Sequence, residues 1–150
     1  MQDFLYYAPT KVYFGKDKHK DIGKIIKEYG FKNIMLQYGK ESIKKNGLYD
    51  EVVKSLKEND INFIEMGGVE PNPKVDFVRR AVKIAKENKV EMILAVGGGS
   101  VIDSSKCTAV GAVSEADIWD YSSHKVVVQD ALPVGCILTI AAAGSEMSSS

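Results

Sequence analysis

The chain has 150 residues, 45% of them hydrophobic and 27% charged, which fits one globular domain and argues against disorder, a collagen-like repeat or a coiled coil. Its 20 basic residues balance 20 acidic ones, so no net charge would draw it to nucleic acid or to an anionic membrane. The longest mostly apolar stretch, residues 131–143, contains Pro133 and Gly135 and is too short for a membrane-spanning helix.

The N-terminal residues and the cysteines favour a cytoplasmic protein. The first residues lack the basic segment and apolar core of a secretory signal. Cys107 and Cys136 lack the spacing of metal or redox motifs, and disulfide-rich secreted chains usually carry more cysteines in fewer residues.

Strands and helices alternate along the chain. Hydrophobic residues at helical spacing predict helices, and short, nearly continuous apolar runs predict strands buried on both faces. In chain order we expect an extended segment at 11–14, a helix at 21–29, a strand at 33–38, a helix at 48–56, a strand at 61–66, a helix at 75–88, a strand at 92–96, a helix at 100–113 and a strand at 135–138.

This order predicts an α/β fold with a doubly wound parallel sheet, because parallel neighbours need crossover connections and these are right-handed. No helix is expected after the last strand to cover it. We therefore expect either that the chain is cut from a longer one, which we favour, or that another chain completes the sheet.

Three glycines and a serine join the strand at 92–96 to the next helix. Gly97, Gly98 and Gly99 would leave backbone N–H groups open at the positive end of the helix dipole, where phosphate binds, and Ser100 could cap the helix and donate to a phosphate oxygen. The alternative is a tight strand-to-helix turn without a ligand. The segment is neither a G-x-G-x-x-G motif, since Ile102 replaces the third glycine, nor a P-loop.

Asp103 and two aromatic residues near position 120 have two interpretations each. Asp103 could face a ribose hydroxyl or a nicotinamide carboxamide, or could simply be placed favourably near the helix dipole. Lys106 is expected to be a solvated helix residue. Trp119 and Tyr121 could flank an adenine or cover the sheet edge.

The segment from Gly97 to Lys106 resembles the G-G-G-S-x-x-D-x-x-K motif of the iron-dependent alcohol dehydrogenases. Similar matches to the butanol-dehydrogenase branch of that family occur throughout the chain, at residues 14–15, 38–39, 44–49, 67–73, 118–121, 138–139 and 144–146. The resemblance implies a Rossmann-like, dehydroquinate-synthase-like N-terminal domain over residues 1–150. This domain would bind NAD(H) or NADP(H).

In that family a following all-helical domain supplies one Asp and three His to Fe²⁺ or Zn²⁺, and we expect that domain to be absent from this chain. With two histidines, His19 and His124, that have no chelating spacing, we expect neither metal ligands nor catalytic residues here. The full-length enzyme would interconvert primary alcohols such as butanol and their aldehydes, and this chain alone would be inactive. A stand-alone nucleotide-binding or assembly module is the alternative.

The resemblance also implies the cofactor contacts. The glycine loop and Asp103 would serve the pyrophosphate and nicotinamide, residues 39–42 would lie beside the adenosine ribose, and residues 139–140 would serve the adenine and ribose. The predicted cofactor-binding residues are Gly39, Lys40, Ser42, Asn72, Gly97, Gly98, Gly99, Ser100, Asp103, Thr139, Ile140 and Ala143.

Departures from the family pattern bear on the choice of cofactor. Gly39 stands where many NAD-specific members carry an Asp that holds the 2′-hydroxyl, so NADP(H) becomes admissible and is slightly favoured. Lys40 could pair with a 2′-phosphate, although Glu41 would oppose this attraction. Ile140 and Ala143 replace threonines found in relatives.

The expected partners are a small alcohol or aldehyde in the full-length enzyme, with no nucleic acid and no membrane. A homodimer is possible, because the N-terminal segment could add as a strand to a neighbouring copy. The residues suited to such pairing are Tyr6, Tyr7, Val12 and Tyr13.

Overall fold

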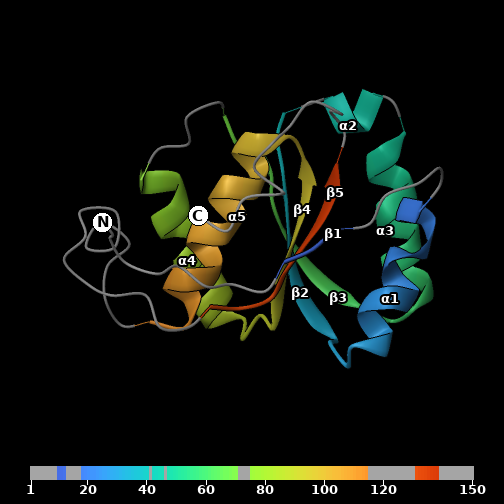
Figure 1. Cartoon of the computed structure of the whole chain (residues 1–150), viewed down its shortest axis with the longest axis horizontal. Helices are drawn as coiled ribbons and strands as arrows, with labels where there is room; N and C mark the ends of the chain where they lie inside the picture. The colour runs from blue at the N-terminus through green and yellow to red at the C-terminus, as the bar shows by residue number, and fades with distance from the viewer. Residues whose placement is uncertain are drawn as a thin grey trace.

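The computed structural model describes residues 10–12, 18–40, 42–45, 47–70, 75–114 and 131–138. Within these ranges it confirms the predicted alternation of strands and helices (Figure 1). The elements are β1 (Thr10–Val12), η1 (Lys18–Asp21), α1 (Ile22–Glu28), β2 (Asn33–Tyr38), α2 (Ser42–Lys45), α3 (Leu48–Glu58), β3 (Asn62–Met66), α4 (Val75–Glu87), β4 (Met92–Gly97), α5 (Gly99–Ala112) and β5 (Val134–Leu138).

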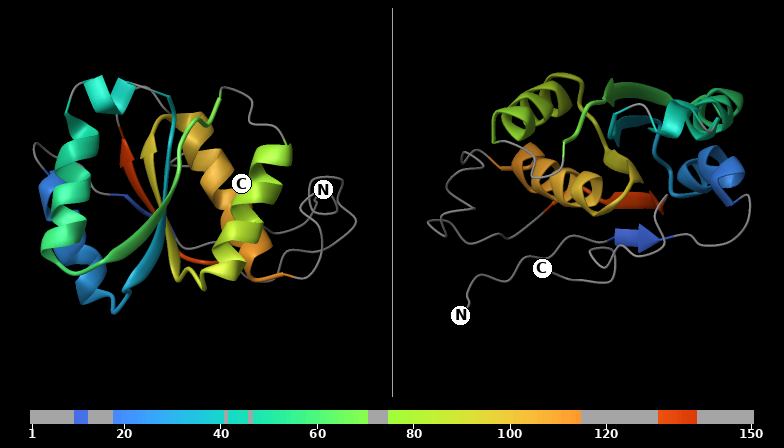
Figure 2. Two further views of the ribbon diagram at one scale, coloured as in Figure 1. Left: turned by 180° about the vertical axis from the view of Figure 1, so that it is seen from behind. Right: turned by 90° about the horizontal axis from the view of Figure 1, so that it is seen from above.

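The strands form one parallel sheet in the order β1-β5-β4-β2-β3. The chain runs outward from β2 to β3, then returns past β2 to β4 and continues to β5. Helices α1 and α3 cover one face of the sheet, and α4 and α5 cover the other, as the two views of Figure 2 show. The predicted doubly wound α/β fold is therefore confirmed.

The two central strands, β2 and β4, are buried on both faces of the sheet, and this is why their sequences are nearly continuous apolar runs. Every residue of β4 is buried, and so is β2 from Ile34 to Tyr38. Because successive side chains of a strand point to opposite faces, Leu36 and Leu94 enter the core under α1 and α3, while Met35 and Ile93 enter the core under α4 and α5.

Some details differ from the sequence prediction. The short helix α2 is not predicted, because four residues are too few to show a helical period. In β1, Val12 pairs with Cys136 of β5, and β1 is an edge strand of the sheet, so its pairing to a neighbouring copy stays a prediction. Tyr6, Tyr7 and Tyr13 lie outside the described residues. No helix in the described ranges is long and apolar enough to cross a membrane.

Candidate functional site

The carboxyl ends of β2 and β4 lie side by side at the point where the chain changes direction. These two strands pair directly, yet the chain leaves β2 toward β3 and leaves β4 toward β5, on opposite sides and through helices on opposite faces. Ligands of open α/β sheets bind in the crevice at such a switch point. Gly39 follows β2 and Gly97 ends β4 at this place.

Gly97 is required by the backbone. Its φ is +151°, and a Cβ built there would lie 2.8 Å from Cγ2 of Val101 in the first turn of α5. A side chain at this position would therefore be strained and would collide with the helix. The glycine lets the chain turn directly from β4 into α5.

Gly39 differs from Gly97 although it lies beside the same valine. A Cβ at position 39 would lie 3.9 Å from Cγ2 of Val101 and 3.6 Å from the carbonyl oxygen of Val69, both ordinary contact distances. The structure therefore has room for a side chain at position 39. The backbone therefore does not require glycine at position 39. The effect of the glycine is that no carboxylate is present there.

Helix α5 begins at a cap residue that has no side chain to bond to its first amides. Its N-cap is Gly98, and the Ile102 amide is bonded to the Gly98 carbonyl at 3.2 Å. Ser100 is the second residue of the helix, so the prediction that it caps the helix is wrong. Gly98, Gly99 and Ser100 are all partly exposed. The positive end of the helix dipole is thus available to an anion.

Asp103 and Lys106 lie further along α5. Asp103 is the fifth residue of the helix and is exposed. The helix dipole acts mainly within the first turn, so the dipole does not explain an acidic residue at this position. Lys106 is only 5% exposed, so the expectation of a solvated lysine is wrong. The cause is that α5 is buried around most of its circumference, with Asp103 and Cys107 exposed between buried neighbours.

A buried polar network joins β2 to α5 just below the site. The Gln37 side chain is fully buried; its Oε1 accepts hydrogen bonds from the Ser104 hydroxyl at 3.1 Å and the Ser105 hydroxyl at 3.2 Å, and its Nε2 donates to the Thr108 hydroxyl at 2.9 Å. Thr108 in turn donates to the Ser104 carbonyl at 2.9 Å. The network fixes α5 relative to the end of β2.

The backbone pairing of β2 with β3 extends past the strand ends. The Gly68 amide donates to the Gly39 carbonyl at 2.9 Å, and the Val69 amide donates to the Tyr38 carbonyl at 3.1 Å. The residues that leave β2 are therefore held against the segment that leaves β3.

Of the predicted cofactor residues, the structure brings Gly39 and the loop from Gly97 to Ser100 to the same edge of the sheet. Lys40 is exposed, and Ser42 begins α2 at that same upper edge (Figure 1). Asn72, Thr139, Ile140 and Ala143 lie outside the described residues, although β5 ends at Leu138 directly opposite Gly97.

Two residues that shape the site were not predicted. Val101 approaches both glycine positions, and Gln37 anchors the glycine-loop helix. Gln37 had a signal in the sequence, because a glutamine within a strand that is otherwise apolar must find hydrogen-bond partners. Its partners Ser104, Ser105 and Thr108 all lie on α5, and Ser104 and Thr108 are four residues apart on one face of that helix.

No group of three or more His, Cys, Asp or Glu side chains that could hold a metal occurs in the part of the chain that the structure describes. We assign no metal ligand there. Cys107 is exposed and Cys136 is buried, and they are not joined in a disulfide.

Residues 9–150 match the family described as iron-containing alcohol dehydrogenase. The chain is 49% identical over 147 residues to the probable NADH-dependent butanol dehydrogenase 2 of Bacillus subtilis, a match that covers 98% of this chain and 37% of that protein. The crystal structure of NADH-dependent butanol dehydrogenase A from Thermotoga maritima aligns with a TM-score of 0.84 at 48% identity, over 93% of this chain and 35% of that one.

A third match is the crystal structure of sulfoacetaldehyde reductase from Bifidobacterium kashiwanohense in complex with NAD+. It aligns with a TM-score of 0.81 at 26% identity, over 99% of this chain and 39% of that one. The chain thus spans less than two fifths of the length of these relatives. On the sequence match and the shared fold together, the chain belongs to the iron-containing alcohol dehydrogenase family.

Proposed function

We propose that residues 1–150 form the dinucleotide-binding domain of a longer NAD(P)-dependent alcohol dehydrogenase. The observation that carries this proposal is the glycine-capped start of α5 beside Gly97 and Gly39 at the switch point of the sheet. The relatives support it, because two of them are named as NADH-dependent and a third was crystallised with NAD+.

In this proposal the chain binds and orients the cofactor. The first amides of α5 and the Ser100 hydroxyl bind the pyrophosphate, and Asp103 faces the nicotinamide side. Residues 39–42 lie beside the adenosine ribose. The remaining proposed contacts come from Asn72, Thr139, Ile140 and Ala143.

The bound nicotinamide supplies hydride transfer, which is the cofactor's own chemistry. We propose that the alcohol or aldehyde and the family's iron or zinc bind to parts of the longer protein beyond these residues, so that this chain alone does not turn over substrate. We also propose a cytoplasmic location, since neither cysteine is in a disulfide.

The choice between the two cofactors depends on Gly39. An Asp at the end of this strand would hold the ribose 2′-hydroxyl of NAD(H) and repel the 2′-phosphate of NADP(H). With glycine there, we propose that NADP(H) is admitted as well as NAD(H). The exposed Lys40 would favour the phosphate, whereas the relatives named above favour NADH.

Calorimetric titration of the chain with NADH and with NADPH tests the proposal. We expect weak binding that persists when divalent metal is chelated. Gly97→Ala should weaken binding at least about tenfold, which corresponds to about 1.4 kcal/mol. The matched control is Gly30→Ala, which also replaces a glycine of positive φ, +87°, but lies after α1 and should leave affinity unchanged.

A second variant tests the choice of cofactor. Because position 39 has room for a Cβ, Gly39→Asp should fold normally, retain NADH binding and lose affinity for NADPH. Absence of binding to either cofactor by the wild-type chain, or equal weakening by Gly97→Ala and Gly30→Ala, would count against the proposed function.

A further inference from the structure

Four side chains from β2, α2, α3 and β3 meet at the carboxyl end of β2, on the face opposite Gln37. The hydroxyl of Tyr38 donates to Oε1 of Glu65 at 2.7 Å, and the hydroxyl of Tyr49 donates to Oε2 of the same carboxylate at 2.7 Å. The two rings meet edge to face with centroids 5.6 Å apart. We call Tyr38, Lys44, Tyr49 and Glu65 the Glu65 cluster.

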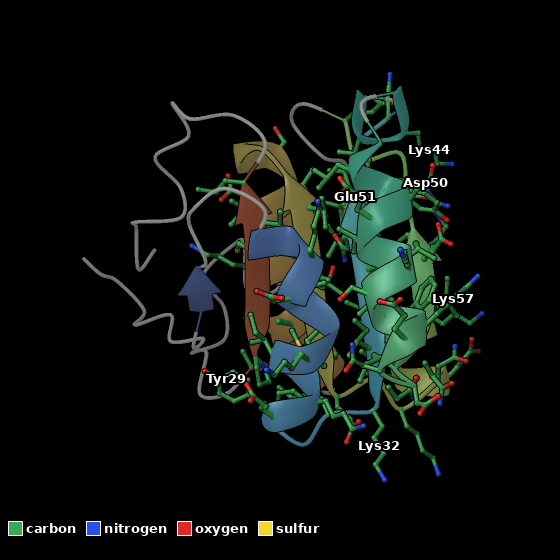
Figure 3. The ribbon with its side chains drawn as sticks, turned by 90° about the vertical axis from the view of Figure 1, so that its right-hand side faces the viewer. Tyr29, Lys32, Lys44, Asp50, Glu51 and Lys57 are labelled. Atoms are coloured by element: carbon green, nitrogen blue, oxygen red, sulfur yellow. The ribbon has the colours of Figure 1, made fainter. Side chains whose placement is uncertain are left out.

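Lys44 completes the cluster from the short helix α2. Its Nζ lies 5.6 Å from the centroid of the Tyr38 ring and 5.1 Å from that of Tyr49, within the range of cation–π attraction. Figure 3 shows Lys44 near Asp50, at the end of α3 that adjoins α2. Lys32 and Tyr29 lie at the opposite end of the molecule in this view. The cluster therefore ties α2 to the strands beneath it.

The two oxygens of the Glu65 side chain each accept a hydrogen bond from one phenol, as a carboxylate can. The hydrogen bond to Glu65, together with burial and the negative charges of Glu65 and Asp50, raises the pKa of Tyr49 to about 12. The phenol thus stays protonated and remains a donor throughout the neutral range. Charge-assisted bonds of this kind are stronger than bonds between neutral groups.

A close backbone approach supports the placement of Tyr38. The residue opposite Tyr38, beyond the end of β3, is Gly67, and a Cβ built on it would lie 2.6 Å from atoms of the Tyr38 ring. The ring therefore lies across the glycine and reaches diagonally to Glu65. Gly68 then bonds to the Gly39 carbonyl, and Val69 bonds to that of Tyr38.

The position of these anchors along the chain carries the inference. Tyr38 comes immediately before Gly39, and Lys44 comes two residues after Ser42. The residues proposed to lie beside the cofactor's adenosine ribose, Gly39, Lys40 and Ser42, are thus bracketed by Tyr38, which bonds to Glu65, and by Lys44, which lies over the two tyrosine rings. The cluster itself faces the α3 side of the sheet, away from α5.

We infer that Glu65 is a positioning residue for the adenosine half of the dinucleotide, holding both ends of residues 39–42 in place for the ribose. The inference rests on the proposed function. It assigns Glu65 no contact with the cofactor. Its effect passes through Tyr38 and Lys44, and the pyrophosphate end of the site, which is built on α5, does not depend on it.

The test separates the two halves of the cofactor. NMR titrations of the chain with AMP and with nicotinamide mononucleotide report affinity for the adenosine and nicotinamide halves. Glu65→Ala should weaken AMP binding about tenfold and leave nicotinamide mononucleotide binding unchanged. Glu65→Gln, which keeps one acceptor oxygen, should recover part of the loss, and Glu87→Ala, at an exposed position on α4, is the matched control.

Amide hydrogen exchange without any ligand gives a second readout. Exchange at Gly68 and Val69 should become faster in Glu65→Ala, and that at Ile102 on α5 should not change. Tyr49→Phe removes one of the two phenols and is expected to have a smaller effect of the same kind, which keeps the test open should Glu65→Ala fold poorly.

Each outcome is decisive. Equal loss of AMP and nicotinamide mononucleotide binding would show a general loss of structure and overturn the positioning role, as would unchanged AMP binding despite faster exchange. If the wild-type chain binds neither mononucleotide nor dinucleotide, the proposed function itself fails. If the wild type binds both mononucleotides and Glu65→Ala binds them equally well, only the role of Glu65 fails.

Discussion

Replacing Gln37 with methionine would remove the polar link between β2 and α5 while keeping an unbranched side chain of similar length. The glutamine is fully buried and makes three side-chain hydrogen bonds to α5. Thr108 would keep its bond to the Ser104 carbonyl. The hydroxyls of Ser104 and Ser105 would both lose their acceptor in the core.

The expected cost follows from these two hydroxyls. A buried donor left without an acceptor costs about 1–3 kcal/mol, and each serine can recover part of this by turning toward the carbonyl four residues earlier in the helix. We therefore expect Gln37→Met to lower the free energy of unfolding by about 2–4 kcal/mol. Ser105→Ala alone should cost about 1 kcal/mol, because Gln37 keeps Ser104 as a donor.

Urea denaturation followed by circular dichroism measures these changes. The control is Asn62→Met, which removes an exposed amide from β3. It should change the free energy of unfolding by less than about 0.5 kcal/mol. Adding Ser104→Ala and Ser105→Ala to Gln37→Met should restore much of the stability, because the orphaned donors are then gone. If Gln37→Met were as stable as Asn62→Met, or if the two alanines lowered stability further, the reasoning would be refuted.

Three further predictions concern other parts of the fold. Gly23→Ala places a Cβ 2.1 Å from the Ser55 carbonyl oxygen and should separate α1 from α3 at a cost of about 1–3 kcal/mol, seen as a lower melting temperature. Glu91→Ala removes the acceptor of two backbone amides, at 2.7 and 2.9 Å, and should cost about 1 kcal/mol in urea denaturation, since water can partly replace it. For Tyr49, whose pKa is raised from 10.0 to about 12, the neutral phenol stabilises the fold fully below pH 10, and this contribution should be lost as the pH rises to about 12. Phenolate absorbance measured against pH should give this higher pKa in the wild type and a lower one in Glu65→Gln.

Local pattern was enough to predict most of the fold. The bounds of β2 agree with the prediction, and those of β3, β4 and β5 differ by one residue, because an apolar run between turn residues marks a buried strand regardless of the rest of the chain. The glycine loop was located for the same reason. Its detail was not predicted: serine is a preferred N-cap, but the positive φ of Gly97 brings the chain into the helix earlier, so that Gly98 becomes the cap.

Tertiary packing decided what the pattern could not. Lysine is rarely buried, so Lys106 was expected in water, yet the surroundings of α5 cover it. The Glu65 cluster joins residues from four elements, and its carboxylate lies on a strand position that reads as solvent-facing. No spacing along the chain predicts that Tyr38 and Tyr49 share one carboxylate, or that Lys44 lies over their rings. These residues come together only because β2 pairs with β3 and because α2 and α3 pack over the two strands.

The two polar groupings together explain how the end of β2 is held. Residues 37 and 38 point to opposite faces because side chains alternate along a strand, so Gln37 bonds to α5 while Tyr38 bonds to Glu65 on the α3 side. Gly39 follows both and would itself add no side-chain contact. A binding segment that is already fixed loses less conformational entropy when the ligand arrives. Anchoring the two residues before it, each to a different layer, therefore lets the strand end in a glycine without leaving the segment loose.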